Sequence, residues 1–279
     1  MSSDSEPPPL SAPTMIDTRE FFLPGSGVSA LLVHGLTGTP YEMRYLGERL
    51  SAAGIRVFAV RLAGHAGTPE ELGATNHHHW YESVVDGCER LRAYGDPIVV
   101  VGLSAGGVLA ARLALDQGEA LSALVMLSPA FFLPFWQRAA LAGVKRLGRW
   151  PGMIYLRATA GSDIHDAAAR AVHPSARLMP LSAALSLCEL SALVRPRLGK
   201  LTQPAMIIHS RRDHTCPFDK NVEYLMANLG SVRKRLVALE ESYHVITVDT
   251  EKERVSNEAL SFIRESFGGA TAEPARAIG

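Results

Sequence analysis

An uninterrupted apolar run, Ile98-Val99-Val100-Val101, leads directly into Gly102-Leu103-Ser104-Ala105-Gly106 and then into an alanine-rich stretch with helical periodicity. A Gly-x-Ser-x-Gly pattern between a strand-like and a helix-like segment is typical of a sharp turn, on which a strained backbone holds the serine hydroxyl clear of both elements. The two glycines remove side chains that would clash where strand and helix approach each other. The pattern therefore predicts a buried strand, a strained turn at Ser104 and a helix directly after it.

Further apolar, β-rich runs recur along the chain, and most are separated by segments with helical periodicity. They cover residues 30–33, 55–60, 98–101, 121–127, 205–209 and 235–239. This alternation predicts an α/β fold with a mostly parallel central sheet. Because the runs are almost continuously apolar, helices are expected on both faces of the sheet. Two helix starts carry the pattern of a capping box, Thr39-Pro40-Tyr41-Glu42 and Thr250-Glu251-Lys252-Glu253.

The order of these segments predicts one α/β core with an insertion. The core is expected at residues 15–129 and 204–267, and residues 130–203, where helical patterns follow without a strand-like run, predict a small helical cap inserted in it. Residues 1–14, rich in Ser and Pro, predict a disordered arm, and residues 268–279 a C-terminal tail. Most apolar cap residues are expected to seat the cap on the sheet and a few to line an acyl pocket: Phe131, Phe132, Phe135, Trp136, Trp150, Met153, Tyr155, Leu181, Leu185, Leu190 and Leu193.

Composition argues against several classes of protein. With 28 basic and 28 acidic residues the formal charge is zero, so a nucleic-acid partner is not expected. No apolar run is long enough for an integral membrane segment and no secretory signal opens the chain; with three widely spaced cysteines, this predicts a cytoplasmic protein. No metal is expected at His77-His78-His79, because consecutive side chains diverge, and no dinucleotide-binding enzyme is expected, because no Gly-x-Gly-x-x-Gly follows a strand. Nothing in the sequence indicates an oligomeric state.

A serine hydroxyl is a weak nucleophile at neutral pH, and it needs an imidazole base that a carboxylate orients. In a fold of this order the acid follows a late strand and the histidine follows the last one. Asp213 comes after the run 205–209, and His244 comes shortly after the run 235–239. We therefore predict Ser104 as nucleophile, Asp213 as orienting acid and His244 as base.

A developing oxyanion needs two donors. The amide of Ala105, at the start of a helix, is one candidate, and the amide of Leu36, in the glycine-containing loop after an early strand, is the other. The remaining polar candidates have plainer interpretations. We expect His34 to order its loop by hydrogen bonding to the backbone, Asp249 to help cap the last helix, Asp163, His165 and Asp166 to lie in a solvated loop, and His209 and His214 to be packed or surface imidazoles.

Four motifs carry a resemblance to a known family: His34-Gly35-Leu36-Thr37-Gly38-Thr39-Pro40, Gly102-Leu103-Ser104-Ala105-Gly106-Gly107, Ser210-Arg211-Arg212-Asp213-His214 and Ser242-Tyr243-His244-Val245-Ile246-Thr247. From about Leu31 to Phe267 the chain resembles bacterial carboxylesterases and monoacylglycerol lipases of the α/β-hydrolase superfamily. The resemblance implies an α/β-hydrolase fold, a small helical cap, the roles given above to Ser104, Asp213, His244, Leu36 and Ala105, and cofactor-free hydrolysis of small-molecule, short- to medium-chain acyl esters.

The chain departs from this family at two places. Ala105 stands where the family usually has a large residue, and Gly64-His65-Ala66-Gly67-Thr68 is one residue longer than the family's loop. A thioesterase or acyltransferase would use the same three residues, and a non-catalytic binding protein of the same fold is a further alternative. If His244 is the base, activity should rise with pH through about 6.5, the ordinary imidazole value.

Overall fold

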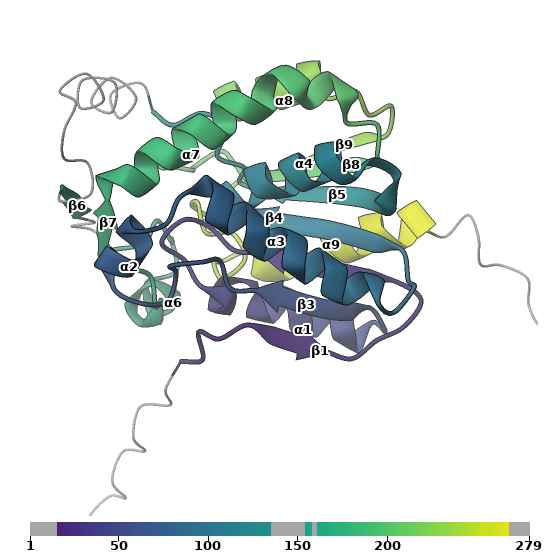
Figure 1. The fold of residues 1–279 in the computed structure, drawn as a ribbon, viewed down its shortest axis with the longest axis horizontal. Coiled ribbons are helices and arrows are strands. Elements are labelled where there is room, and N and C mark those ends of the chain that lie inside the picture. The colour runs from purple at the N-terminus through teal and green to yellow at the C-terminus, as the bar shows by residue number, and fades with distance from the viewer. Residues whose placement is uncertain (1–15, 135–153, 158–160, 268–279) are drawn as a thin grey trace, which may run out of the picture.

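The computed structural model of the chain describes residues 16–134, 154–157 and 161–267 (Figure 1). Seven strands form one sheet in the order β1-β3-β2-β4-β5-β8-β9, in which β1 runs antiparallel to β3 and all other neighbours are parallel. The strands are β1 (Phe21–Leu23), β2 (Ser29–Val33), β3 (Arg56–Val60), β4 (Ile98–Leu103), β5 (Leu121–Leu127), β8 (Ala205–Ser210) and β9 (Lys234–Leu239). The mostly parallel sheet predicted from the sequence is confirmed.

Helices cover both faces of this sheet. The helices α3 (His77–Arg92), α4 (Ala105–Gln117), α7 (Leu181–Val194) and α8 (Phe218–Asn228) pack on one face, and α1 (Arg44–Ala52) and α9 (Lys252–Phe267) pack on the other (Figure 1). The shorter helices are α2 (Pro69–Gly73), α6 (Ala167–Val172), η1 (Pro40–Met43), η2 (Gly118–Ala120) and η4 (Arg195–Lys200). None of the helices that the structure describes is long and apolar enough to cross a membrane.

The sheet is buried on both faces because its side chains alternate between two cores. Leu31 joins the cluster around Trp80 of α3, whereas its neighbour Leu32 joins the cluster around Leu46 of α1. Every residue of β2, β4 and β8 is buried. A one-residue slip would exchange these two sets and mismatch each with the helix side chains on its face, so the close packing of both cores fixes the register. The carboxyl ends of the parallel strands consequently share one edge, where the loops that follow them meet.

Three short strands were not predicted. β1 has three residues, and so do β6 (Tyr155–Arg157) and β7 (Leu178–Pro180), which pair antiparallel inside the segment expected to be wholly helical. The expectation of a cap without strands is therefore wrong. It was wrong because three residues are too few to show a period in the sequence. The predicted arm (1–14), the tail (268–279) and four of the apolar cap residues, Phe135, Trp136, Trp150 and Met153, lie outside the described residues.

Neither predicted capping box forms. The Thr39 side chain makes no cap hydrogen bond, and the Glu42 carboxylate instead accepts the amide of Gly35 at 3.1 Å. At the second place the Thr250 hydroxyl donates to the Asp249 carboxylate at 3.2 Å, and α9 begins at Lys252. The Glu42 carboxylate and the Thr250 hydroxyl thus bind partners outside the expected boxes, whereas the Thr39 hydroxyl is buried without a hydrogen-bond partner among the described residues.

Candidate active site

The turn between β4 and α4 has the strained backbone that its sequence predicts. Ser104 has φ 55° and ψ −114°, a conformation that L-residues rarely adopt. A Cβ on Gly102 would lie 2.1 Å from the carbonyl oxygen of Gly106, and a Cβ on Gly106 would lie 2.2 Å from that of Val33. The strand and the helix therefore approach so closely that only glycine fits at either position.

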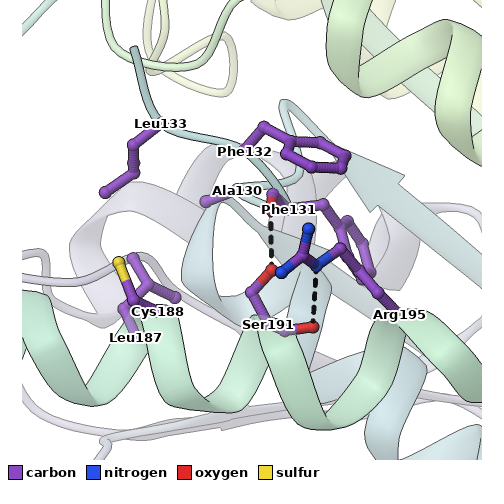
Figure 2. A pocket seen from close by; sticks show the side chains of 8 residues that line it. All are labelled: Ala130, Phe131, Phe132, Leu133, Leu187, Cys188, Ser191 and Arg195. Carbon is purple, nitrogen blue, oxygen red and sulfur yellow. Dashed lines mark hydrogen bonds between the residues drawn. The ribbon is translucent and has the colours of Figure 1, made fainter. Parts of the chain in front are cut away.

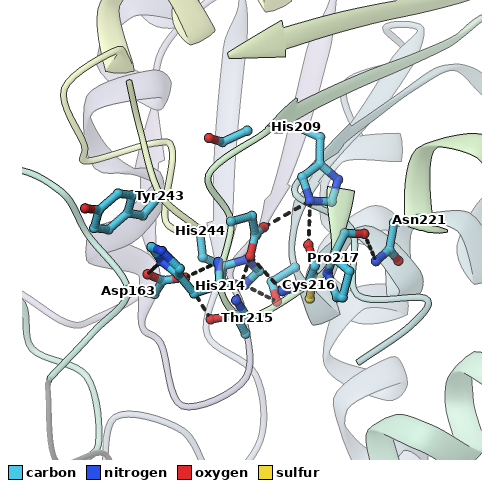
Figure 3. Close-up of polar contacts among 12 residues, drawn as sticks. Asp163, His209, His214, Thr215, Cys216, Pro217, Asn221, Tyr243 and His244 are labelled. Atoms are coloured by element: carbon cyan, nitrogen blue, oxygen red, sulfur yellow. Dashed lines mark hydrogen bonds and ion pairs between the residues drawn. The ribbon is translucent and has the colours of Figure 1, made fainter. Parts of the chain in front are cut away.

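Residues from two other loops meet Ser104 at this turn, and Figure 3 shows one of them, His244. His244 Nε2 lies 2.8 Å from Ser104 Oγ, and His244 Nδ1 lies 2.7 Å from Asp213 Oδ2. Because an ionised carboxylate only accepts, Nδ1 carries the proton and Nε2 is left to accept the serine proton. The imidazole is thus held in the tautomer that a general base needs.

Asp213 is hydrogen-bonded through both oxygens. Oδ1 accepts the amides of Thr215 at 2.8 Å and Cys216 at 2.6 Å, while Oδ2 accepts from His244 and from His209 Nε2, the latter at 3.0 Å. Burial alone would raise the pKa of Asp213, but the charge of His244 and the hydrogen bonds of both histidines outweigh it and hold that pKa well below its usual range. The carboxylate stays ionised at every pH at which the protein is expected to work.

His209 has a closer relation to the site than the sequence suggested. Its ring is fully buried, and Nε2 also lies 3.0 Å from the carbonyl oxygen of Cys216. Both neighbours of Nε2 accept, so Nε2 carries a proton and donates to them. The packed imidazole expected at this position is therefore also a hydrogen-bond partner of Asp213, four residues further along the chain.

The pKa of His244 is raised. Burial alone would lower it, because a charged ring loses its hydration, but the charge and hydrogen bond of Asp213 and the charges of Asp163 and Glu42 raise it by more. The ring therefore becomes neutral, and able to accept a proton, only at a pH above its ordinary titration range.

The loops that carry Asp213 and His244 are fixed by Asp163 (Figure 3). Its carboxylate accepts the amide of His214 at 3.0 Å and the hydroxyl of Thr215 at 3.1 Å, and its carbonyl oxygen accepts the amides of His244 at 3.0 Å and Val245 at 3.1 Å. The expectation that Asp163 lies in a solvated loop is wrong. It was wrong because all of these partners lie 51 or more residues away along the chain.

Asp249 fixes the same region from the other side. Its carboxylate accepts the amides of His165 and Asp166, both at 2.8 Å, and that of Tyr243 at 2.7 Å. The expected role in capping α9 is limited to its carbonyl oxygen, which accepts the amide of Lys252 at 3.0 Å. The segment around His165 and Asp166 is consequently tied to the loop of His244 and is not a free solvated loop.

Two backbone amides are available near Ser104. A Cβ on Gly35 would lie 3.3 Å from Ser104 Cβ, so the loop after β2 runs beside the serine. The amide of Leu36 has no acceptor among the described residues, and Ala105 is the first residue of α4, where an amide has no intrahelical acceptor. His34 orders this loop as predicted, because Nδ1 lies 2.9 Å from the carbonyl oxygen of Gly35 and Nε2 accepts the amide of Leu62 at 3.2 Å.

The loop from Gly64 to Thr68, expected from the sequence to be one residue longer than in the family it resembles, contains a residue with a left-handed backbone conformation. Ala66 has φ 63°, and the neighbouring His65 ring is buried with its centroid 5.1 Å from that of His34 and 5.7 Å from that of Trp80. Burial, together with the neighbouring His34, lowers the pKa of His65 to about 3. His65 is therefore a neutral packing group at working pH.

A small pocket lies between the chain that follows β5 and helix α7 (Figure 2). Its volume is about 50 Å³, several times what a single water molecule requires. In Figure 2 the Ser191 hydroxyl donates to the carbonyl oxygen of Phe131 and Arg195 donates to that of Ser191. Ser104, Asp213 and His244 do not line it, although the amide of Ala130, which does, donates to the carbonyl oxygen of Ser104 at 3.2 Å. Within the described ranges no group of three or more His, Cys, Asp or Glu residues is placed to hold a metal ion.

The sheet order, the elbow at Ser104 and the placement of Asp213 and His244 define an α/β-hydrolase fold. The family model described as serine aminopeptidase, S33, matches residues 28–251, and the chain belongs to this family.

Several known proteins resemble the chain over most of its length. It is 32% identical to a thermostable monoacylglycerol lipase of Bacillus sp. (strain H-257), covering 92% of this chain and 98% of the relative. A carboxylesterase of Bacillus subtilis (strain 168) is 25% identical, covering 90% and 98%. A solved structure from work on LipS and LipT, two metagenome-derived lipolytic enzymes, is 32% identical with a TM-score of 0.81, covering 89% of this chain and 98% of that one.

Proposed function

We propose that this protein is a serine carboxylic-ester hydrolase that cleaves short- to medium-chain acyl esters, monoacylglycerols among them, through an acyl-enzyme intermediate. The observation that carries the proposal is the pair of contacts made by His244, 2.8 Å to Ser104 Oγ and 2.7 Å to Asp213 Oδ2. The relatives named as a monoacylglycerol lipase and a carboxylesterase support oxygen esters over other acyl compounds.

In the first half of the reaction, Ser104 Oγ attacks the ester carbonyl carbon while its proton passes to His244 Nε2. The carbonyl oxygen becomes an oxyanion and accepts hydrogen bonds from the amides of Leu36 and Ala105. The tetrahedral intermediate then collapses. The bond to the leaving oxygen breaks, His244 gives its proton to the departing alcohol, and the acyl group stays on Ser104.

In the second half, a water molecule takes the place of the alcohol. His244 accepts a proton from the water as its oxygen attacks the acyl carbon, the same two amides hold the new oxyanion, and Ser104 leaves with the proton returned by His244. Asp213 remains ionised throughout, which keeps the ring oriented and stabilises its charged form in both halves.

The proposal includes a cap formed by residues 130–203 and action in the cytoplasm. Within that segment, the described residues from 161 onward reach the candidate site. The Ala176 amide donates to the carbonyl oxygen of Thr37, next to Leu36, at 3.0 Å. Cys88 and Cys216 are buried and form no disulfide, which agrees with a reducing compartment.

The direct test is Ser104→Ala. We expect kcat on a p-nitrophenyl ester to fall by a factor on the order of 10^4 to 10^6, because no other group replaces the nucleophile, while the thermal unfolding curve keeps its shape. Labelling with a fluorophosphonate probe is the companion measurement. The wild type should be labelled once, at Ser104, and the variant should not. A variant that keeps most of its esterase activity, or a wild type that resists labelling, contradicts the proposal.

A substrate panel separates this function from its alternatives. We expect turnover of p-nitrophenyl esters and monoacylglycerols to exceed that of acyl-CoA thioesters and of amino-acid amides. Preferred cleavage of thioesters, or transfer of the acyl group to an added alcohol in place of water, would indicate the thioesterase or acyltransferase alternative. Binding of these compounds without turnover or labelling would indicate a non-catalytic binding protein.

A further inference from the structure

A second carboxylate, Glu42, is buried near Ser104 without belonging to the proton-transfer chain. Its exposure is 4%, and its Oε1 lies 3.2 Å from His173 Nε2, at ion-pair distance although without hydrogen-bond alignment. Burial alone would raise the pKa of Glu42, but the contact with His173, the charge of His34 and the amide of Gly35 lower it by more. Burying an ionised carboxylate is costly for the stability of the fold, so a role other than stabilisation accounts better for Glu42.

The other oxygen of Glu42 holds the loop that carries the Leu36 amide. Oε2 accepts the amide of Gly35 at 3.1 Å, and Gly38 leaves the space that the carboxylate occupies, because a Cβ there would lie 2.2 Å from Oε2. The amide of Gly38 donates to the carbonyl oxygen of Gly35 at 3.1 Å and closes a four-residue turn with Leu36 and Thr37 at its centre. Thr37 has φ 65° and Leu36 has no positive φ, the combination that a type II turn requires at its two central positions.

The turn is held on its other side by the segment that contains His173. The amide of Ala176 donates to the carbonyl oxygen of Thr37 at 3.0 Å. His173 is itself fixed, since its Nδ1 lies 2.7 Å from Ser162 Oγ, which in turn lies 2.6 Å from Ser175 Oγ. The peptide of Leu36 therefore sits between two anchors, Glu42 acting on Gly35 and Ala176 acting on Thr37.

We propose that the Glu42–His173 pair is a positioning device for the oxyanion hole, which holds the Gly35–Gly38 turn so that the Leu36 amide points to the oxygen of the tetrahedral intermediate. The inference rests on the proposed function, because it presumes that an oxyanion forms at Ser104. Its physical reason is preorganisation: a donor that is already aimed need not reorient as charge develops. Glu42 acts through the turn and touches no reacting atom.

The test compares Glu42→Leu with Glu42→Gln. Leucine removes the acceptor for the Gly35 amide, whereas glutamine keeps an acceptor of the same reach. We expect Glu42→Leu to lower kcat on the order of 10- to 100-fold with KM changed by less than about 3-fold, and Glu42→Gln to recover most of the loss. The affinity for a trifluoromethyl ketone, which forms a charged tetrahedral adduct with the serine, should fall by the same factor as kcat/KM.

A matched control is Asp116→Leu. It removes a carboxylate that pairs with Arg197 at 2.6 Å, at the far end of α4 from Ser104, and it should leave kcat and inhibitor affinity unchanged. If Glu42→Leu does not fold, His173→Leu carries the same comparison, with His173→Gln as the conservative partner. The affinity for the trifluoromethyl ketone should fall more in His173→Leu than in His173→Gln.

The outcomes separate this inference from the function on which it rests. A wild type that hydrolyses no ester and takes no fluorophosphonate overturns both. An active wild type whose Glu42 and His173 variants keep full kcat overturns the positioning role alone. The positioning role alone is also overturned if the leucine and glutamine variants lower kcat equally and keep the affinity for the inhibitor, because that result indicates a general loss of structure.

Discussion

At the scale of single residues, the Asp213 carboxylate determines how the site can work. Four hydrogen bonds reach its two oxygens, from the amides of Thr215 and Cys216 and from the rings of His209 and His244. With its acceptor directions occupied, the carboxylate has no freedom to rotate away from His244 Nδ1. The orientation of the His244 ring is consequently set through Asp213 by Thr215, Cys216 and His209, none of which is hydrogen-bonded to that ring.

The first prediction concerns pH. His244 must be neutral to accept the serine proton, and its pKa is raised, so kcat/KM should rise with increasing pH through an inflection above the ordinary imidazole value of about 6.5. The expected pH of the inflection is therefore higher than the value of about 6.5 predicted from the sequence alone. Initial rates on a p-nitrophenyl ester between pH 5 and 9, corrected with Ser104→Ala at each pH, give the profile. A flat profile would contradict the assignment of the base, and an inflection at or below 6.5 would contradict the raised pKa of His244.

The sequence was informative about some of these residues and silent about others. Ser104, Asp213 and His244 could be found because each follows a strand-like run in a fixed order, and the structure brings all three within hydrogen-bond distance. Asp163 and Glu42 could not be found, because their partners lie on other segments and no local pattern records the contact. For His209 the only signal was its place at the end of a strand, four residues before Asp213.

At the scale of elements, the crossing of β4 and α4 depends on glycine. We expect Gly106→Ala to destabilise the protein by about 3 kcal/mol or more, because the added methyl group would lie 2.2 Å from the backbone oxygen of Val33, which cannot move without disturbing the sheet. Urea unfolding followed by circular dichroism measures the loss.

Gly199→Ala is the matched control for this substitution. The nearest atom to its added Cβ is 3.9 Å away, so its stability should stay within about 0.5 kcal/mol of the wild type. Equal stability of the two variants would show that strand and helix are less closely packed than the structure has them.

The elements divide into those with a period in the sequence and those without one. β2, β4, β5 and β8 are long, apolar and buried, and α3 carries a buried stripe that includes Trp80 and Val84, so all of them were predictable. β1, β6 and β7 have three residues each, and their pairing is decided by neighbours elsewhere in the fold. The capping boxes failed for the same reason, since Glu42 and Thr250 find better partners outside their helices.

At the scale of the whole molecule, the Asp249 carboxylate joins the segment of His165 to the loop of His244. Asp249→Asn keeps the shape but turns an amide group toward backbone donors at 2.7–2.8 Å, so buried N–H groups lose an acceptor. We expect a loss of about 2 kcal/mol in unfolding free energy together with a reduced kcat. The Tm and the rate on a p-nitrophenyl ester are the measurements.

Asp86→Asn is the control for this prediction, because Asp86 is exposed on α3 and makes no hydrogen bond with the described residues. This substitution should change neither the unfolding free energy nor kcat. The pH dependence of stability offers a second check. Burial alone would raise the pKa of Asp249, but four backbone amides lower it by more, so its stabilising effect is present above the ordinary carboxyl pKa and is lost as the pH falls toward the lowered one. An Asn variant as stable as the wild type at neutral pH would be evidence against this role.

The segment from Ser162 to Ala176 contacts the turn of Leu36 directly through Ala176 and indirectly through His173 and Glu42. It contacts the loop of His244 through Asp163. The proposed oxyanion turn and the loop of the proposed base are therefore attached to the same segment. A ligand that displaces this segment would disturb oxyanion stabilisation and proton transfer together. Attempts to broaden the range of accepted esters by redesigning this stretch should therefore alter catalytic speed at the same time.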